Sequence, residues 1–156
     1  MTIRAFQDHY PDDVACCYGC GHLNEQGYRI KSHWDGDEAI CTFRPQPYHT
    51  SIRGYVYGGL LASLIDCHSM ATAAAAWMRA NGIEIGEAAT ERFVTGSLKV
   101  DYLAPTPIDC ELVIRARAIE IGKRKVIVDA EVIAGGVVTA RGHTIAVRMP
   151  EHMLPG

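Results

Sequence analysis

The chain has 156 residues, a mass of 17.1 kDa and a formal net charge of −3. Its 48% hydrophobic and 21% charged residues are typical of one folded domain and exclude a disordered chain. The weakly negative charge argues against a dedicated nucleic-acid-binding protein, which needs a basic face to displace counterions from phosphates. We therefore expect a single domain over residues 1–156 and no nucleic-acid partner.

Six cysteines are spread along the chain: Cys16, Cys17, Cys20, Cys41, Cys67 and Cys110. They are too few, in too long a chain, for a disulfide scaffold. The first ten residues contain no apolar stretch of the kind that a signal peptide needs. We therefore expect reduced thiols in a cytoplasmic protein.

Residues 58–78 are long and apolar enough to be tested as a membrane span. Asp66 and His68 lie near the middle of this stretch, and an Asp alone costs ~2.5–3.5 kcal/mol at the centre of an inserted helix. Much of the remainder is alanine, which adds little hydrophobic drive. We interpret the stretch as a buried helix and expect no membrane partner.

The predicted elements follow the order β-β-α-β-β-β-β after an irregular segment over residues 1–27, where prolines and glycines recur. The elements are residues 28–34, 39–43, 58–80, 92–103, 111–120, 125–134 and 137–148. Short connections favour an antiparallel sheet, because parallel pairs need long crossovers. In the strand over 92–103, alternation places Thr95 on the polar face, away from Val94 and Leu98, and Gly96 marks either a bulge or a face at a subunit interface.

The predicted helix over 58–80 is apolar nearly all round, so it must be enclosed. A curled antiparallel sheet wrapped around the helix satisfies both elements. The expected fold class is therefore α+β, with a curled antiparallel sheet around one long central helix.

Asp66 is the most informative residue, because it is a carboxylate on an apolar helix with no cation among its neighbours along the helix face. Desolvation there raises a carboxyl pKa towards values useful for a general base. The alternative is that Asp66 accepts a hydrogen bond from a backbone amide or a serine and only fixes packing.

Gly58 and Gly59 open the same helix. Backbone N–H groups in a first helical turn have no intrahelical partner, and glycine lets a ligand carbonyl approach them closely. This is the geometry of an oxyanion hole. The alternative is a flexible start to the helix.

Three motifs resemble one family. Gly58–Asp66 resembles the helix start of the hotdog-fold acyl-CoA thioesterases, and the phenylacetate-degradation (PaaI-like) branch is the most similar, with its His-Gly-Gly and an acid seven residues later. Residues 102–105 (Tyr-Leu-Ala-Pro) resemble the end of a strand in that family, and residues 17–28 (Cys-Tyr-Gly-Cys-Gly, then Asn and Gly-Tyr) resemble its N-terminal segment. The resemblance covers roughly residues 17–148.

The resemblance implies a homodimer or a dimer of dimers with active sites between subunits, an acyl-CoA substrate, and no metal or organic cofactor. It implies that Asp66 is the general base or nucleophile. It also implies that Gly58, with Gly59, polarises the thioester carbonyl and that Thr95 positions the water. The expected reaction is hydrolysis of an acyl-CoA to CoA and a carboxylic acid.

Two residues depart from the family pattern. Tyr57 stands in place of the family's histidine, and Ser51 in place of its asparagine six residues earlier. A tyrosine can donate a hydrogen bond, but its pKa near ~10 prevents it from shuttling protons readily. Because of these changes, a non-catalytic module that binds an acyl-CoA remains the alternative. A hotdog hydratase ranks last, because this sequence contains no recognisable His/acid dyad.

Other signals carry less weight. Cys17 and Cys20 have the spacing of zinc ligands, but the sequence contains no second Cys-x-x-Cys or His-x-x-x-His pair. We therefore expect these thiols to pack against other residues and to bind no metal. His49, His68 and His143 are interpreted as core or interface histidines. Lys123 and Arg124 could receive CoA phosphates, and the alternative is a solvated hairpin tip.

Overall fold

The computed structural model describes residues 3–154. Six strands form one antiparallel sheet in the order β1-β2-β4-β5-β6-β3, which curls around a single long helix. The elements are β1 (His33–Asp35), β2 (Glu38–Phe43), α1 (Gly58–Ala80), β3 (Phe93–Tyr102), β4 (Leu112–Ile121), β5 (Lys125–Ala134) and β6 (Val137–Arg148). The expected α+β class, with a curled sheet around one central helix, is confirmed.

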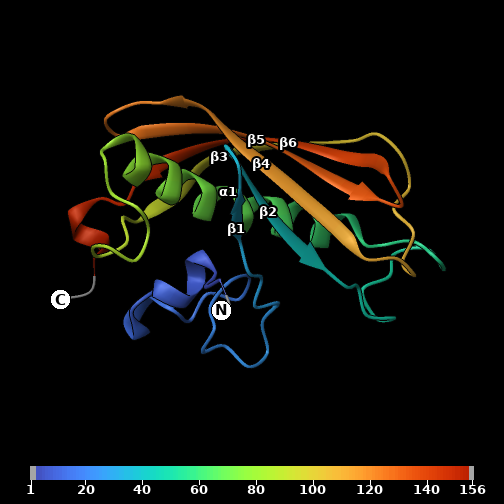
Figure 1. Cartoon of the computed structure of the whole chain (residues 1–156). Coiled ribbons are helices and arrows are strands. Elements are labelled where there is room, and N and C mark those ends of the chain that lie inside the picture. The colour runs from blue at the N-terminus through green and yellow to red at the C-terminus, as the bar shows by residue number, and fades with distance from the viewer. Residues whose placement is uncertain (1–2, 155–156) are drawn as a thin grey trace.

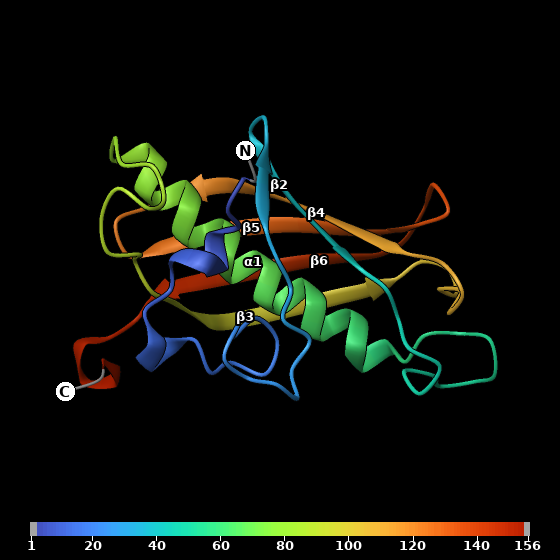
Figure 2. The same cartoon turned by 60° about the horizontal axis from the view of Figure 1, so that its bottom comes forward.

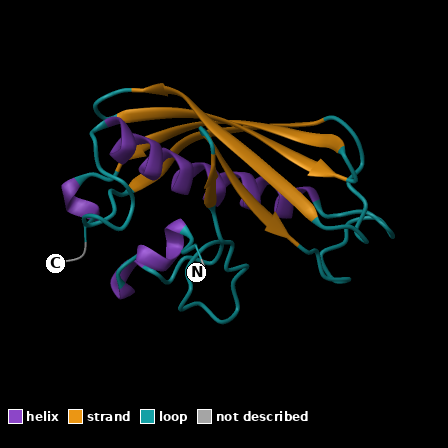
Figure 3. Cartoon of the chain, viewed as in Figure 1, coloured by secondary structure: helices purple, strands orange, loops and turns teal. Residues whose placement is uncertain are grey.

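α1 lies against one face of the sheet, as Figures 1 and 3 show. Leu60, Leu64 and Ile65 from the helix are fully buried against strand residues such as Ile114. The approach is close at Gly142 on β6, where a Cβ atom would lie 2.3 Å from Cγ2 of Ile65. A glycine is needed there for the helix to reach the sheet.

The other side of α1 is covered by the N-terminal segment, which crosses the helix on the side away from the sheet (Figure 2). This segment contains two short 3-10 helices, Phe6–His9 and Asp12–Val14. Its contact with α1 is polar at one point: Ser32 Oγ lies 2.8 Å from Nδ1 of the fully buried His68, whose Nε2 lies 3.1 Å from the Ala39 carbonyl. The interpretation of His68 as a core histidine is confirmed.

Enclosure on two sides explains why α1 is apolar nearly all round. By length and composition α1 could cross a membrane, but 67% of its most apolar window is buried within the fold. The core helix of a folded domain also meets these criteria of length and composition. The burial of α1 within the fold is that of such a core helix.

The first predicted strand is too long. Residues 28–34 were expected to be extended, but β1 covers only His33–Asp35. Arg29 has a φ of 52°, which interrupts an extended chain. In addition, the N–H groups of Tyr28 and Ile30 donate to carbonyls of the N-terminal loop, not to a strand. The hairpin of β1 with β2 is present, but long-range hydrogen bonds to the N-terminal loop shorten its first strand.

β3 forms one edge of the sheet, and among the described residues its strand partner is β6 alone. Its register with β6 shifts between Thr95 and Ser97, so the bulge expected at Gly96 is present. A bulge changes which face the following and preceding side chains occupy. This change sets the position of Thr95 in the site.

Candidate active site

Asp66 projects from the middle of α1 towards the edge strand β3. The Thr95 hydroxyl donates a hydrogen bond to Oδ1 of Asp66 over 2.5 Å. Simple alternation along β3 places Thr95 away from the helix, and the bulge at Gly96 brings it back. The structure thus brings together two of the residues that the resemblance places in the site.

The surroundings of Asp66 favour a proton acceptor. Burial raises the pKa of the Asp66 carboxyl above its usual value, the hydrogen bond from Thr95 opposes this shift, and the nearby Cys17 thiolate reinforces it. A carboxylate with a raised pKa takes a proton from water more readily than an exposed one. The chemistry available at Asp66 is therefore that of a general base.

A cavity of about 450 Å³ opens beside this pair. Asp66 and Thr95 line it, together with the apolar side chains of Met70, Phe93 and Val94. The N-terminal segment closes part of the cavity with Cys17, Cys20 and Tyr10. An acidic group on the wall of a mostly apolar hollow is a typical setting for a catalytic residue.

Gly58 and Gly59 form the first turn of α1. Within residues 3–154, neither glycine N–H donates a hydrogen bond to another residue, and no side chain caps the helix. Two free N–H groups at the positive end of a helix are suited to binding a developing oxyanion.

Two tyrosines flank this glycine pair. The Tyr57 ring lies over Gly59, where a Cβ atom would be 2.5 Å from it, and Tyr102 lies beside Gly58. The Tyr102 hydroxyl donates to the Gly58 carbonyl over 2.7 Å. Tyr102 was missed as a site residue, although the Tyr-Leu-Ala-Pro motif that begins with it was a usable signal.

The glycine pair and the acid lie far apart within one chain. Asp66 follows Gly58 by eight positions, which is ~12 Å along the axis at a rise of ~1.5 Å per residue. The free N–H groups and the acid therefore lie on separate parts of the same helix.

Ser51 and the two basic residues lie outside the Asp66–Thr95 pair. Ser51 lies exposed in a turn, where its N–H donates to the Tyr55 carbonyl. Lys123 and Arg124 line a separate hollow together with Arg148 and His152, and Met149 lines both this hollow and the Asp66 cavity. The basic hollow is thus next to the Asp66 cavity.

The remaining histidines differ from one another. His49 is half-buried and packs against the rings of Tyr28 and Phe43. His143 is not a core residue: its side chain is 49% exposed, and its Nδ1 lies 2.7 Å from a carboxylate oxygen of Asp129. It is exposed because it alternates with the inward-facing Thr144 and Gly142 on β6.

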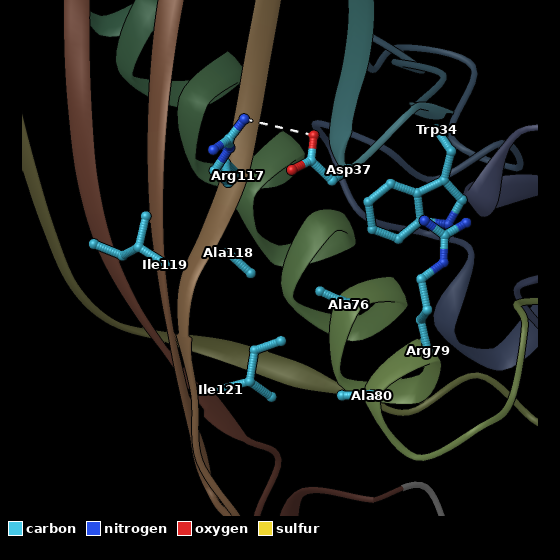
Figure 4. Close-up of a pocket in the computed structure, with 9 residues that line it drawn as sticks. All are labelled: Trp34, Asp37, Ala76, Arg79, Ala80, Arg117, Ala118, Ile119 and Ile121. Atoms are coloured by element: carbon cyan, nitrogen blue, oxygen red, sulfur yellow. Dashed lines mark hydrogen bonds and ion pairs between the residues drawn. The ribbon is translucent and has the colours of Figure 1, made fainter.

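A further hollow of about 590 Å³ lies between β4, the β1–β2 hairpin and the last turns of α1 (Figure 4). Arg117 and Asp37 form an ion pair across it, and the Arg79 guanidinium stacks on Trp34. The helix residues that line it begin ten positions beyond Asp66, ~15 Å along the axis. This hollow is therefore separate from the site.

Comparisons with known proteins identify the family of this chain. The model of the thioesterase superfamily matches residues 53–140. A solved thioesterase superfamily protein from Shewanella loihica is 45% identical, with a TM-score of 0.66 over 79% of this chain and 93% of that one. The PaaI protein of the E. coli phenylacetic acid degradation operon, 18% identical, shares the fold with a TM-score of 0.64 over 79% and 81% of the two chains.

A curated relative, acyl-coenzyme A thioesterase THEM4 of Xenopus laevis, is 30% identical over 93 residues, 60% of this chain. The match spans only 36% of that protein's length. The fold and the site define a hotdog-fold protein with an acid on its central helix. The chain belongs to the thioesterase superfamily.

Proposed function

We propose that this protein hydrolyses the thioester bond of an acyl-CoA, with Asp66 as the general base. The observation that carries the proposal is the Asp66 carboxylate, held by Thr95 on the wall of a mostly apolar cavity. Because Thr95 donates to Oδ1, Oδ2 is left to accept a proton from water. Direct attack by the carboxylate on the carbonyl is the alternative use of the same group.

In the proposed reaction, water adds to the thioester carbonyl while Asp66 takes one of its protons. The carbonyl oxygen becomes an oxyanion, which the N–H groups of Gly58 and Gly59 stabilise. The tetrahedral intermediate then breaks its C–S bond and expels the CoA thiolate. The proton held by Asp66 passes to this thiolate, so that CoA and a carboxylic acid leave and the carboxylate of Asp66 is restored.

The resemblance to the hotdog thioesterases implies active sites between subunits, so we propose that each site is built from two copies of the chain. We assign the N–H donors of each site to one subunit and the acid to its partner, in a homodimer or a dimer of dimers. The exposed edge strand β3, which carries Thr95 and whose strand partner among the described residues is β6 alone, supports pairing at this edge.

Two observations support a CoA ester as substrate. The curated relative is named an acyl-coenzyme A thioesterase. Next to the Asp66 cavity, Lys123 and Arg124 line one hollow, and their positive charges suit the phosphates of CoA.

One observation favours the second candidate, a module that binds an acyl-CoA without cleaving it. The Tyr57 ring lies directly over Gly59, in the place where the family has a histidine. A phenol in that place can donate a hydrogen bond but is a poorer proton shuttle than an imidazole.

The test is free-thiol release from acetyl, medium-chain, long-chain and aryl CoA esters, with Asp66→Asn and the matched control Asp37→Asn. Asp37 is an exposed carboxylate in the hairpin, far from the cavity. We expect Asp66→Asn to lower kcat by ~10²–10⁴-fold with little change in KM, because the amide keeps the shape but accepts no proton. Asp37→Asn should behave as the wild type.

Two results would contradict the proposal. Full activity of a well-folded Asp66→Asn protein would exclude Asp66 as the base. Tight binding of CoA esters without thiol release from any of them would identify the binding module instead. Thermal melts of all three proteins distinguish a loss of chemistry from a loss of folded protein.

A further inference from the structure

Three cysteines meet beside the proposed active site. Cys17 and Cys20 lie in the N-terminal loop, and Cys67 follows Asp66 on α1. Their Sγ atoms all lie within 4.8 Å of one another, and those of Cys17 and Cys67 are 3.7 Å apart. The sequence provides only a Cys-x-x-Cys pair, and the tertiary structure adds the third thiol from a position fifty residues away.

The loop is shaped to fit around Cys67. A Cβ atom on Gly19 would lie 2.3 Å from the Cys67 Sγ, so only glycine allows this approach. The Gly21 N–H closes the loop by donating to the Cys17 carbonyl over 2.8 Å. The Ile30 N–H donates to the Gly19 carbonyl over 3.2 Å and holds the loop in place. The backbone conformation of this loop therefore brings the three thiols together.

The spacing of the sulfurs suits a tetrahedral metal ion. Zinc binds thiolate sulfur at ~2.3 Å, and two such ligands in a tetrahedron lie ~3.8 Å apart. The Cys17–Cys67 distance of 3.7 Å agrees with this value. A disulfide would join only two of the three sulfurs and would leave the convergence of the third without a role.

The cluster is open to solvent on one side. Cys17 is exposed, whereas Cys20 and Cys67 are partly buried, so an ion can reach the cluster from solvent.

We propose that Cys17, Cys20 and Cys67 bind one thiophilic divalent metal ion, of the Zn²⁺ class, and so fasten the N-terminal loop to α1 next to Asp66. Three protein ligands leave one of the four tetrahedral positions for water or another small ligand. This proposal differs from the expectation of packing thiols made from the sequence. It does not rest on the proposed hydrolysis, and its test does not use activity.

The test uses the whole chain, reduced, freed of metal with a chelator, and then given Zn²⁺ or Co²⁺ alone. We expect about one zinc ion per chain by elemental analysis after gel filtration. We also expect Co²⁺ to give the intense absorption of a sulfur-to-metal charge transfer. The thermal midpoint of the metal-free protein should rise when zinc is restored, because the ion binds only the folded loop and helix together.

The variants Cys17→Ser and Cys67→Ser should bind zinc at least ~100-fold more weakly, since loss of even an outer-shell partner costs ~10–100-fold. Cys16→Ser is the matched control, because Cys16 is an exposed neighbour outside the cluster. Circular dichroism of the metal-free variants shows whether each is folded, and Cys20→Ser provides a third variant if Cys67→Ser is not.

Either of two results would overturn the proposal. The first is substoichiometric zinc in fully reduced wild-type protein. The second is zinc binding that survives in Cys17→Ser and Cys67→Ser as well as it does in Cys16→Ser. A disulfide between two of the three cysteines, found in protein that binds no metal once reduced, would assign the cluster to redox chemistry instead.

Discussion

The hydroxyl of Thr95 on the edge strand β3 donates a hydrogen bond to the Asp66 carboxylate on α1. This bond joins the sheet to the helix at the one point where the helix carries an acid. It engages Oδ1, so Oδ2 is the oxygen that we propose accepts the proton. A hydrogen bond to a charged group is worth ~1.5–3 kcal/mol.

Replacing Thr95 with valine removes this donor and keeps the shape of the side chain. We expect kcat for acyl-CoA hydrolysis to fall ~10–100-fold in Thr95→Val, because the carboxylate loses its orientation. Thr95→Ser retains the hydroxyl and should restore most of the rate. KM should change little in both variants. Full activity in Thr95→Val, together with a loss in Thr95→Ser, would show that the methyl group, not the hydroxyl, matters.

Tyr57 occupies the place of the family's histidine over Gly59. If its ring supplies a weaker form of the same contact, Tyr57→His should raise kcat or leave it unchanged. The measurement is thiol release from the best substrate of the panel, with Tyr48→His as the control because Tyr48 is 77% exposed. A large loss in Tyr57→His alone would give Tyr57 a role of its own, such as stacking on an aromatic acyl group.

Because we propose a site shared between two subunits, activity should require an oligomer. We expect sedimentation at micromolar concentration to give a dimer or tetramer of the 17.1 kDa chain. A stable, active monomer would contradict both the oligomer and the assignment of the two groups to different subunits.

Stability should fall as the pH drops from about 6.5 towards 4, because of His68. Burial lowers the pKa of His68 from 6.5 to about 4 in the folded protein. Between these values the unfolded chain binds a proton that the folded chain does not, so the free energy of unfolding decreases, by as much as ~3 kcal/mol at pH 4. Denaturant melts in the presence of a chelator measure this change.

The variants His68→Gln and His143→Gln provide the comparison. His68→Gln removes the buried imidazole and should flatten this part of the pH profile. His143 lies half exposed on β6, so His143→Gln should keep the wild-type profile. Identical slopes in the wild type and in His68→Gln would show that other groups cause the acid loss.

Much of the fold was predictable from local patterns. The helix over Gly58–Ala80 and the strands Lys125–Ala134 and Val137–Arg148 begin and end where the sequence predicts. Each is delimited by residues with a local conformational effect, such as Gly82 and the glycine pair Gly135-Gly136, all of which have positive φ. Periodicity and turn chemistry act within a few residues, so they can be read from a single sequence.

The sequence by itself also determined which groups could carry chemistry: an acid on an enclosed helix, and two glycines with free N–H groups at its start. Their residue types and spacing follow from chain order alone. The identification of Thr95 as a partner of Asp66 came from the family resemblance, since alternation placed its side chain on the opposite face.

Only the tertiary structure decided which distant groups meet. Thr95 reaches Asp66 because a bulge against β6 alters the register, and Cys67 meets Cys17 because the N-terminal loop crosses α1 at a glycine. The N–H groups of Tyr28 and Ile30, which were predicted to lie in a strand, donate hydrogen bonds to carbonyls of the same loop. These contacts depend on how the chain packs against segments far away in the sequence. The free energy that selects them comes from burial and long-range hydrogen bonds, which no local pattern records.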